Sequence, residues 1–282
     1  MEENKIKILI QLLEDPDTEV YEAVYQEILK LGKNYYPLLE SEFKSSQNEL
    51  VKTRLMLILQ QFQGELVTDK LLNWRKGGGE SLLEGWSLVT QYFYPTFNFL
   101  DYKKKISNWV HKIWLKTRPN MKIEQKIRTV ISFLEKQDFY FKRTDDLYTN
   151  PELMFLNTVV DQKKGNYLSI CLLLNIIFHQ LEIYTHVVSV EGRFFVRYLD
   201  YKEHYYVNPI IYSKDIFYEE DLKVFLIMEK KELNLLHYKP ISNIYLILHL
   251  LDLLKSLYKE HQNHEQYKKA QALLEYIDIK FI

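Results

Sequence analysis

Apolar residues over the first half of the chain recur at the helical spacing. This spacing predicts a first helix over residues 5–13, a break at Pro16, and a second helix over residues 20–31 that ends at Gly32. The same spacing predicts helices over the segments 37–43, 50–62, 66–74, 80–92, 100–115 and 123–136. We therefore expect residues 1–136 to form a helical N-terminal region.

The pattern changes after residue 136. A long apolar helix is expected over residues 168–181, followed by strands at 184–190, 194–199 and 205–207. Helical spacing returns in the segments 152–160, 219–228, 241–258 and 265–277. The sequence thus predicts an α+β, predominantly helical fold, with a core at 137–230 around a small antiparallel sheet and a C-terminal helical hairpin at 231–282.

Two features of the helical region have tempting functional interpretations that we do not adopt. The run Gly77-Gly78-Gly79 lacks the preceding strand and the Gly-Lys-Ser/Thr ending of a phosphate-binding loop, so we expect a flexible connector. An aromatic-rich stretch could stack bases, but its charge is mixed, and we expect these rings to form a helix-packing core. Its members are Trp86, Tyr92, Phe93, Tyr94, Phe97, Phe99, Trp109 and Trp114.

Composition excludes several classes of protein. The chain has 282 residues, 47% of them hydrophobic, and a formal net charge of -1, so nothing in its global charge indicates nucleic acid or an anionic membrane as partner. One cysteine rules out an internal disulfide framework and a multi-cysteine zinc site. The N-terminal residues lack the apolar core of a signal peptide, and no apolar run reaches about 20 residues. We expect a cytoplasmic protein.

Three short motifs occur in the order helix, strand, strand. They are Lys164-Gly-Asn-Tyr-Leu-Ser169, Glu191-Gly-Arg-Phe194 and Val207-Asn-Pro209. They resemble the Gly-Asn-Pro-x-Ser/Thr-Leu, Pro-Gly-His-Phe and Ile-Asp-Pro motifs of SirB-type transglutaminase-like proteins. Asn150-Pro151, Leu82-Leu-Glu-Gly85 and the segment from Ser242 also resemble parts of that family. The resemblance implies a papain-like or transglutaminase-like core flanked by a HEAT-like helical bundle and a tetratricopeptide-like hairpin.

The departures from the family pattern decide the functional expectation. The catalytic cysteine, histidine and aspartate positions of the family correspond to Tyr167, Arg193 and Asn208. Arginine stays protonated and cannot act as a general base, and an ordinary phenol is a poor nucleophile at neutral pH. We therefore expect a non-catalytic scaffold that binds a protein or peptide, with no cofactor and no metal. The expected binding residues are Gly165, Asn166, Tyr167, Ser169, Arg193 and Asn208.

An alternative is a cysteine-dependent acyl transferase or hydrolase. Cys171 lies one helical turn after Tyr167, and His186 is on the strand that follows, so a shifted pair is conceivable. However, Cys171 is surrounded in sequence by Ile170, Leu172 and Leu173, and a buried apolar thiol is normally inert. We expect a buried core cysteine.

Other pairs of polar residues indicate weaker sites. His179 with Glu182, and His261 with His264, have spacings that would suit a metal, but a zinc site needs three or four ligands. The second pair falls in the expected turn of the C-terminal hairpin. Arginines at 193 and 197 beside Glu191 would suit an anion-binding surface, although arginines at strand ends are usually structural.

Overall fold

The structure is a computed structural model that describes residues 2–139, 150–199, 204–207, 216–228, 230 and 239–279. The chain divides into two compact units, Met1–Leu72 and Asn73–Ile282. The predicted divisions at 136/137 and 230/231 remain predictions. Within the described residues, every helix is too short or too polar to cross a lipid bilayer.

The first unit is helical, as predicted. It contains α1 (Glu2–Leu12), α2 (Thr18–Leu31), the 3-10 helix η1 (Lys33–Tyr35), α3 (Tyr36–Ser45) and most of α4 (Glu49–Lys76). Asp17 caps α2, because its side chain accepts a hydrogen bond from the amide of Glu19. Arg54 is buried against the Tyr21 ring and donates a hydrogen bond of 2.9 Å to the carbonyl of Leu13, which satisfies the end of α1.

Helix α4 corrects one prediction. The sequence indicated separate helices over 50–62 and 66–74, whereas the structure has one helix of 28 residues. Gly64 lies in its interior, and a side chain at that position would meet nothing within 4 Å. A single glycine lowers helix propensity by only about 1 kcal/mol, which is too little to end a helix that packs along its length.

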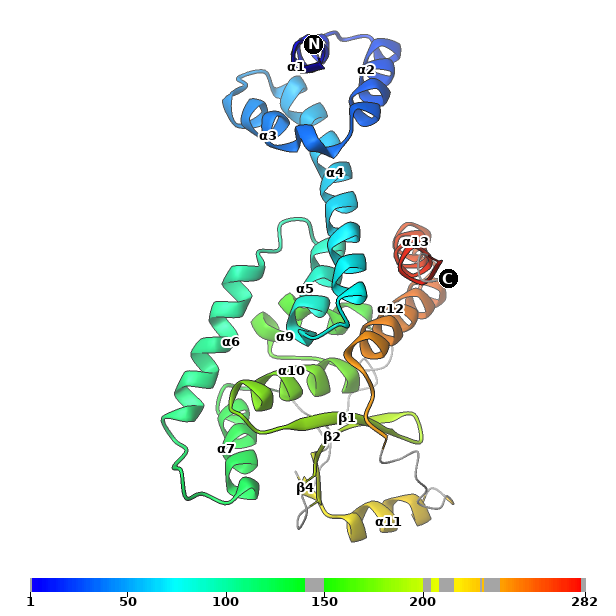
Figure 1. Cartoon of the computed structure of the whole chain (residues 1–282). Coiled ribbons are helices and arrows are strands. Elements are labelled where there is room, and N and C mark those ends of the chain that lie inside the picture. The colour runs from blue at the N-terminus through cyan, green and yellow to red at the C-terminus, as the bar shows by residue number, and fades with distance from the viewer. Residues whose placement is uncertain are drawn as a thin grey trace. The chain divides into compact units, whose positions relative to one another are not determined.

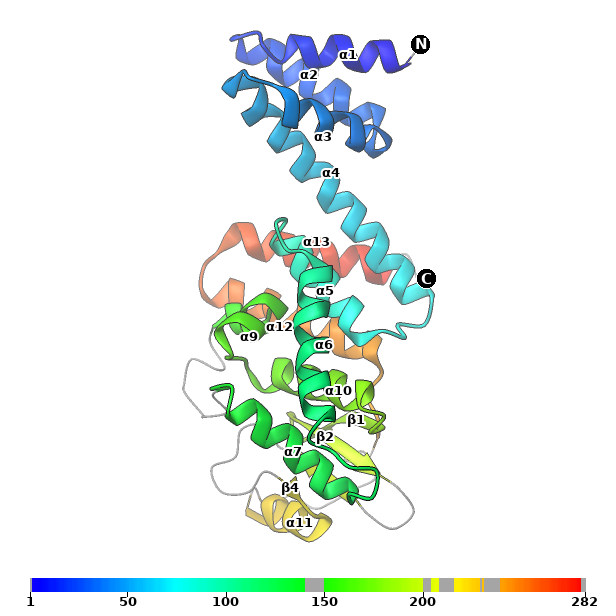
Figure 2. The same cartoon turned by 90° about the vertical axis from the view of Figure 1, so that its left-hand side faces the viewer.

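The second unit contains the remaining helices, close to the predicted ranges, except that the helix predicted over 152–160 is interrupted at Phe155, whose backbone is extended. They are α5 (Leu82–Phe93), α6 (Phe99–Trp114), α7 (Ile123–Glu135), η2 (Pro151–Met154), α9 (Leu156–Gln162), α10 (Tyr167–Gln180), α11 (Glu219–Met228), α12 (Asn243–Glu260) and α13 (His264–Ile279). Helices α12 and α13 pack as the expected hairpin, and Figure 2 shows α6 and α7 on the side of this unit that faces the viewer. The prediction of a predominantly helical fold with a small antiparallel sheet is confirmed.

The sheet has four antiparallel strands in the order β1-β2-β3-β4. They are β1 (Thr185–Val190), β2 (Arg193–Leu199), β3 (His204–Val207) and β4 (Ile216–Phe217). Glu191 and Gly192 both have positive φ and form the two-residue turn between β1 and β2. The two-residue strand β4 was not predicted, because two residues carry no periodic signal.

Different helices cover the two faces of this sheet. Thr185 on β1 donates a hydrogen bond of 2.8 Å to the Asn175 side chain, so its face meets α10. Val188 and Val190 pack with Leu222 and Leu226 of α11 on the other face. Figure 1 shows α10 and α11 on opposite sides of the strands.

The Gly77–Gly79 run is a tight turn and not the loose connector that we expected. Gly78 and Gly79 have φ of 87° and 66°, and the amide of Gly79 bonds to the Trp74 carbonyl at 2.9 Å. A Cβ on Gly79 would lie 2.5 Å from the Ile244 side chain of α12. The turn therefore packs against α12.

The aromatic residues of α5 and α6 form a packing core in part. Trp86 is fully buried, and Phe93 lies 5.2 Å from Phe155, ring centre to ring centre. Trp114, however, is 61% exposed, so the prediction of a core position is wrong for this residue. The core face of α6 is set by Ile106 and Ile113, both fully buried, and Trp114 points away from that face.

Candidate functional site

The start of α10 is held in place by hydrogen bonds within the core. Asn166 is the N-cap, and its side chain accepts a hydrogen bond of 2.8 Å from the amide of Ser169. The Ser169 hydroxyl donates to the carbonyl of Leu153 at 2.7 Å, and the Asn166 amide donates to the same carbonyl at 3.4 Å. The helix start is thereby fixed to η2.

Gly165 permits this close contact. A Cβ at this position would lie 2.6 Å from the Ser169 hydroxyl oxygen and 2.8 Å from the Ile170 side chain. Gly165, Asn166 and Ser169 are all buried. Because these three residues are buried, they can contribute to binding only by shaping the start of α10.

Tyr167 is the first residue of α10, and its predicted correspondence to the catalytic cysteine stays a prediction. Its half-buried side chain packs against Leu153. A helix N-terminus stabilises a thiolate or an oxyanion through its dipole and its amides. Here the amides of Ser169 and Ile170 already bond to Asn166. The side chains at this helix start are the amide of Asn166, the phenol of Tyr167 and the hydroxyl of Ser169.

Cys171 lies one turn further into the helix and has no exposed surface. Burial raises the pKa of its thiol well above the ordinary value. The neutral thiol is therefore the form present at neutral pH. A thiol in this state is a weak nucleophile.

His186 belongs to the other face of the sheet. Side chains alternate along a strand, and the neighbouring Thr185 faces α10, so His186 faces away from the helix that carries Cys171. It lies opposite Arg197 on β2, and its pKa is lowered by partial burial and by the charges of His179 and Arg197. The structure does not bring Cys171 and His186 together.

Arg193 is the first residue of β2 and lies opposite Val190. The register therefore places it on the face that α11 covers. Arg197, on the same face, is 7% exposed and lies over the Tyr206 ring. Asn208 lies outside the described residues, so the predicted grouping of Tyr167, Arg193 and Asn208 stays a prediction.

The remaining metal candidates are not assembled into a site. Within the ranges that the structure describes, no three His, Cys, Asp or Glu side chains gather where they could hold a metal ion. His179 instead contacts the Thr185 carbonyl at 2.6 Å. His261 and His264 are exposed at the turn between α12 and α13.

His249 on α12 was not singled out from the sequence. Its half-buried ring stacks on Tyr245 and lies 5.2 Å from the Phe194 ring, centre to centre. Burial lowers its pKa, so the neutral imidazole is favoured. In the sequence, His249 lies one helical turn after Tyr245, and this spacing could have indicated that the two rings share one face of the helix.

The comparisons with known proteins agree with this architecture. A sequence model of the transglutaminase-like superfamily matches residues 100–252, more than half of the chain. The chain belongs to the transglutaminase-like superfamily. The match includes α10 and the whole described sheet of this superfamily member. No curated protein and no solved structure gave a significant match.

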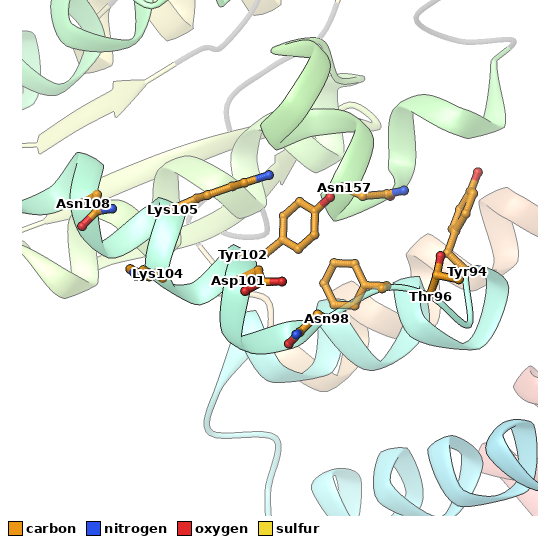
Figure 3. Close-up of a pocket in the computed structure, with 10 residues that line it drawn as sticks. Tyr94, Thr96, Asn98, Asp101, Tyr102, Lys104, Lys105, Asn108 and Asn157 are labelled. Carbon is orange, nitrogen blue, oxygen red and sulfur yellow. The ribbon is translucent and has the colours of Figure 1, made fainter. Parts of the chain in front are cut away.

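A polar pocket lies beside this core, between the start of α6 and α9 (Figure 3). Its volume is about 550 Å³, and the rings of Phe97 and Tyr102 stack at 4.6 Å within it. Asp161 accepts hydrogen bonds from Tyr102 and Lys105, both at 2.5 Å, and burial and this carboxylate raise the pKa of Tyr102 to about 12. The lining residues are Tyr94, Thr96, Phe97, Asn98, Asp101, Tyr102, Lys104, Lys105, Asn108 and Asn157.

Four of the nine polar residues that line this pocket already form hydrogen bonds within the fold, among them Tyr102 and Lys105 with Asp161. The Asn98 side chain caps α6, and Tyr94 bonds to Glu152. The side-chain oxygen of Asn157 is buried and has no hydrogen-bond partner among the described residues. This single acceptor is too little to indicate which class of ligand the pocket would bind.

Proposed function

We propose that this chain is a non-catalytic, SirB-type member of the transglutaminase-like superfamily that works by binding a protein or peptide. The observation that carries the proposal is the state of Cys171. It is the one thiol in the sequence, it has no exposed surface, and burial raises its pKa. We further propose that Tyr167, the first residue of α10, occupies the position of the family's nucleophile.

The closed start of α10 supports the loss of chemistry. An acyl-transfer site needs donors aimed at the developing oxyanion and a base within reach of the nucleophile. The Ser169 amide is occupied by the Asn166 side chain, and His186 faces away from α10. The alternative enzyme would need Cys171 to cross from the core to a base on the other face of the sheet.

The flanking helices support a binding role. Helices α1 and α2, and helices α12 and α13, are consecutive pairs that pack together, as in the units that present peptide-binding surfaces in helical repeat proteins. We extend the proposal to HEAT-like and tetratricopeptide-like relationships for these hairpins, to the cytoplasm as the location, and to Tyr167 and Arg193 as members of the binding region. Fold alone does not establish function, so the proposal needs a direct test.

The catalytic half is tested by turnover measurements on the full chain and on Cys171→Ala. Hydrolysis of p-nitrophenyl acetate and incorporation of a fluorescent amine into casein should proceed at the same background rate with both proteins. A rate that depends on Cys171 would contradict the proposal. The binding half is tested by selecting a displayed random-peptide library on the native chain, with the heat-unfolded chain as the negative selection.

A further inference from the structure

The end of α6 carries large apolar side chains that the core does not use. Trp114 is 61% exposed and Leu115 is 64% exposed, whereas the other tryptophans are wholly or largely buried. Tyr184, which follows α10, is 71% exposed. Exposed aromatic residues that gather on one side of a molecule often mark an interaction site.

A pocket of about 290 Å³ lies beside Trp114. The end of α6, the loop after it and α7 form one wall, and the chain that leaves α10 forms the other. Its size suits one bulky side chain and falls just below the range of small-molecule sites. The lining residues are Trp114, Thr117, Arg118, Pro119, Lys126, Gln180, Leu181, Glu182 and Ile183. We call these residues the Trp114 face.

The segment that supplies this face is strongly basic. Residues 111–128 contain six lysines or arginines and one acidic residue, Glu124. Glu124 pairs with Arg128 at 2.9 Å. Within the described part of the chain, the other five cations form no ion pair, although Lys116 lies over the Phe133 ring at 5.1 Å. Because the whole chain carries a net charge of -1, this positive excess is local.

The arrangement favours an acidic peptide over a nucleic acid strand. Leu181, Ile183 and Pro119 give the pocket an aliphatic lining, which suits an apolar side chain. Single-stranded nucleic acid needs successive aromatic platforms, whereas this face exposes one indole ring that already stacks on His111 at 6.2 Å. Glu182 is the one carboxylate among the lining residues, and it would disfavour phosphate as much as carboxylate.

We propose that the Trp114 face binds an acidic peptide segment of a partner protein, with a bulky apolar side chain of the peptide in the pocket and its carboxylates on Arg118 and Lys126. The proposal rests on the binding role proposed above and assigns that role a partner chemistry. Tryptophan and arginine dominate interface energetics when they are enclosed by a partner, and the surrounding lysines would speed association and select for negative charge.

The test uses the peptides that the native full chain enriches from the displayed random library. We expect enriched peptides to carry net negative charge and a large apolar residue next to the acidic ones. Synthetic versions, measured by fluorescence polarisation, should bind R118E/K126E and W114A about tenfold or more weakly than the unmodified chain. Raising the salt concentration should weaken binding, because exposed charges are screened.

The matched control is K259E/K268E, which makes the same net charge change at two exposed lysines of α12 and α13 that do not line this pocket. Its affinity should stay within about twofold of the unmodified chain. No enrichment, enrichment without an acidic bias, or binding that ignores R118E/K126E would overturn the inference. Tight binding of an oligothymidylate strand that depends on Trp114 would also overturn it, in favour of nucleic acid. Turnover that depends on Cys171 would instead refute the proposed non-catalytic function. It would not change the conclusion from the peptide measurements.

Discussion

The two ends of α10 use their polar groups in opposite ways. At its start, Asn166 and Ser169 are buried and bond to each other and to the carbonyl of Leu153. At its end, the chain after Gln180 lines an open pocket with the exposed Trp114 and with basic residues that have no ion pair among the described residues. One end is closed by internal hydrogen bonds, and the other presents its groups to solvent.

This difference separates polar groups that stabilise the fold from groups that are available for binding. At the start of α10, the side chains of Asn166 and Ser169 are used in hydrogen bonds within the core. At the other end, Trp114 is exposed and five basic residues form no ion pair among the described residues, so we expect these side chains to add little to the stability of the fold. Features that natural proteins retain without a stability benefit are the ones to examine for function.

The largest expected effect comes from removing the side chain that fixes η2 beneath the closed end. Trp86 is fully buried, and its ring nitrogen donates a hydrogen bond of 2.8 Å to the carbonyl of Met154. Trp86→Ala should lower the free energy of unfolding by about 3–5 kcal/mol, measured by urea denaturation. Trp86→Phe, which keeps much of the ring, should lose less. Equal losses in both variants would show that packing contributes little here.

A second prediction concerns the pH dependence caused by Cys171. Burial raises the pKa of its thiol in the folded state, so above about pH 8.5 the unfolded chain loses this proton while the folded chain keeps it. The stability of the unmodified chain relative to Cys171→Ala should therefore be constant below about pH 8 and fall as the pH rises. By pH 10 the fall should reach about 2 kcal/mol. A difference that is flat up to pH 10 would mean that the thiol is not buried.

Weakening the hydrogen bonds at the start of α10 should cost less. Ser169→Ala removes a buried hydroxyl that donates to the carbonyl of Leu153 and should lower the free energy of unfolding by about 1–2 kcal/mol. Asn166→Ala removes the cap and should cost about 1 kcal/mol, whereas Asn166→Ser should restore most of that. Thermal unfolding followed by circular dichroism measures all three. If neither alanine variant is destabilised, this end is not the closed site described above.

The smallest effect on stability is expected at the open end. Trp114→Ala should change the free energy of unfolding by no more than about 0.5 kcal/mol, because the side chain is exposed. The same variant should lose peptide affinity. A stability loss as large as that of Trp86→Ala would mean that Trp114 is covered in the folded protein and would remove the contrast between the two ends.

The sequence predicted most of the closed end, because local signals determine it. The apolar run after Ser169 predicted α10 to within one residue at each end and the burial of Cys171. The cap formed by Asn166 was not predicted, although asparagine is a preferred N-cap residue. The sheet face of His186 could not be assigned, because alternation along β1 fixes which residues share a face and leaves open which face meets α10.

The open end was missed for a different reason. Trp114 is a typical core residue by composition, and its exposure follows from the angle between its side chain and the buried Ile113 on α6. The excess of lysine and arginine over residues 111–128 can be counted in the sequence, but the net charge of -1 for the whole chain gave no reason to look for a basic segment. The basic segment and the chain after α10 line one pocket because of tertiary packing, and no local sequence pattern predicts that contact.

The most direct test of the central claim is the rate at which iodoacetamide labels Cys171 in the native chain, followed by intact mass near pH 7.5. The matched control is the double variant Tyr167→Cys, Cys171→Ala, which moves the thiol to the half-exposed first residue of α10. We predict that the control is labelled in the native state, whereas the unmodified chain is labelled only after unfolding. Rapid labelling of native Cys171 would contradict the non-catalytic assignment.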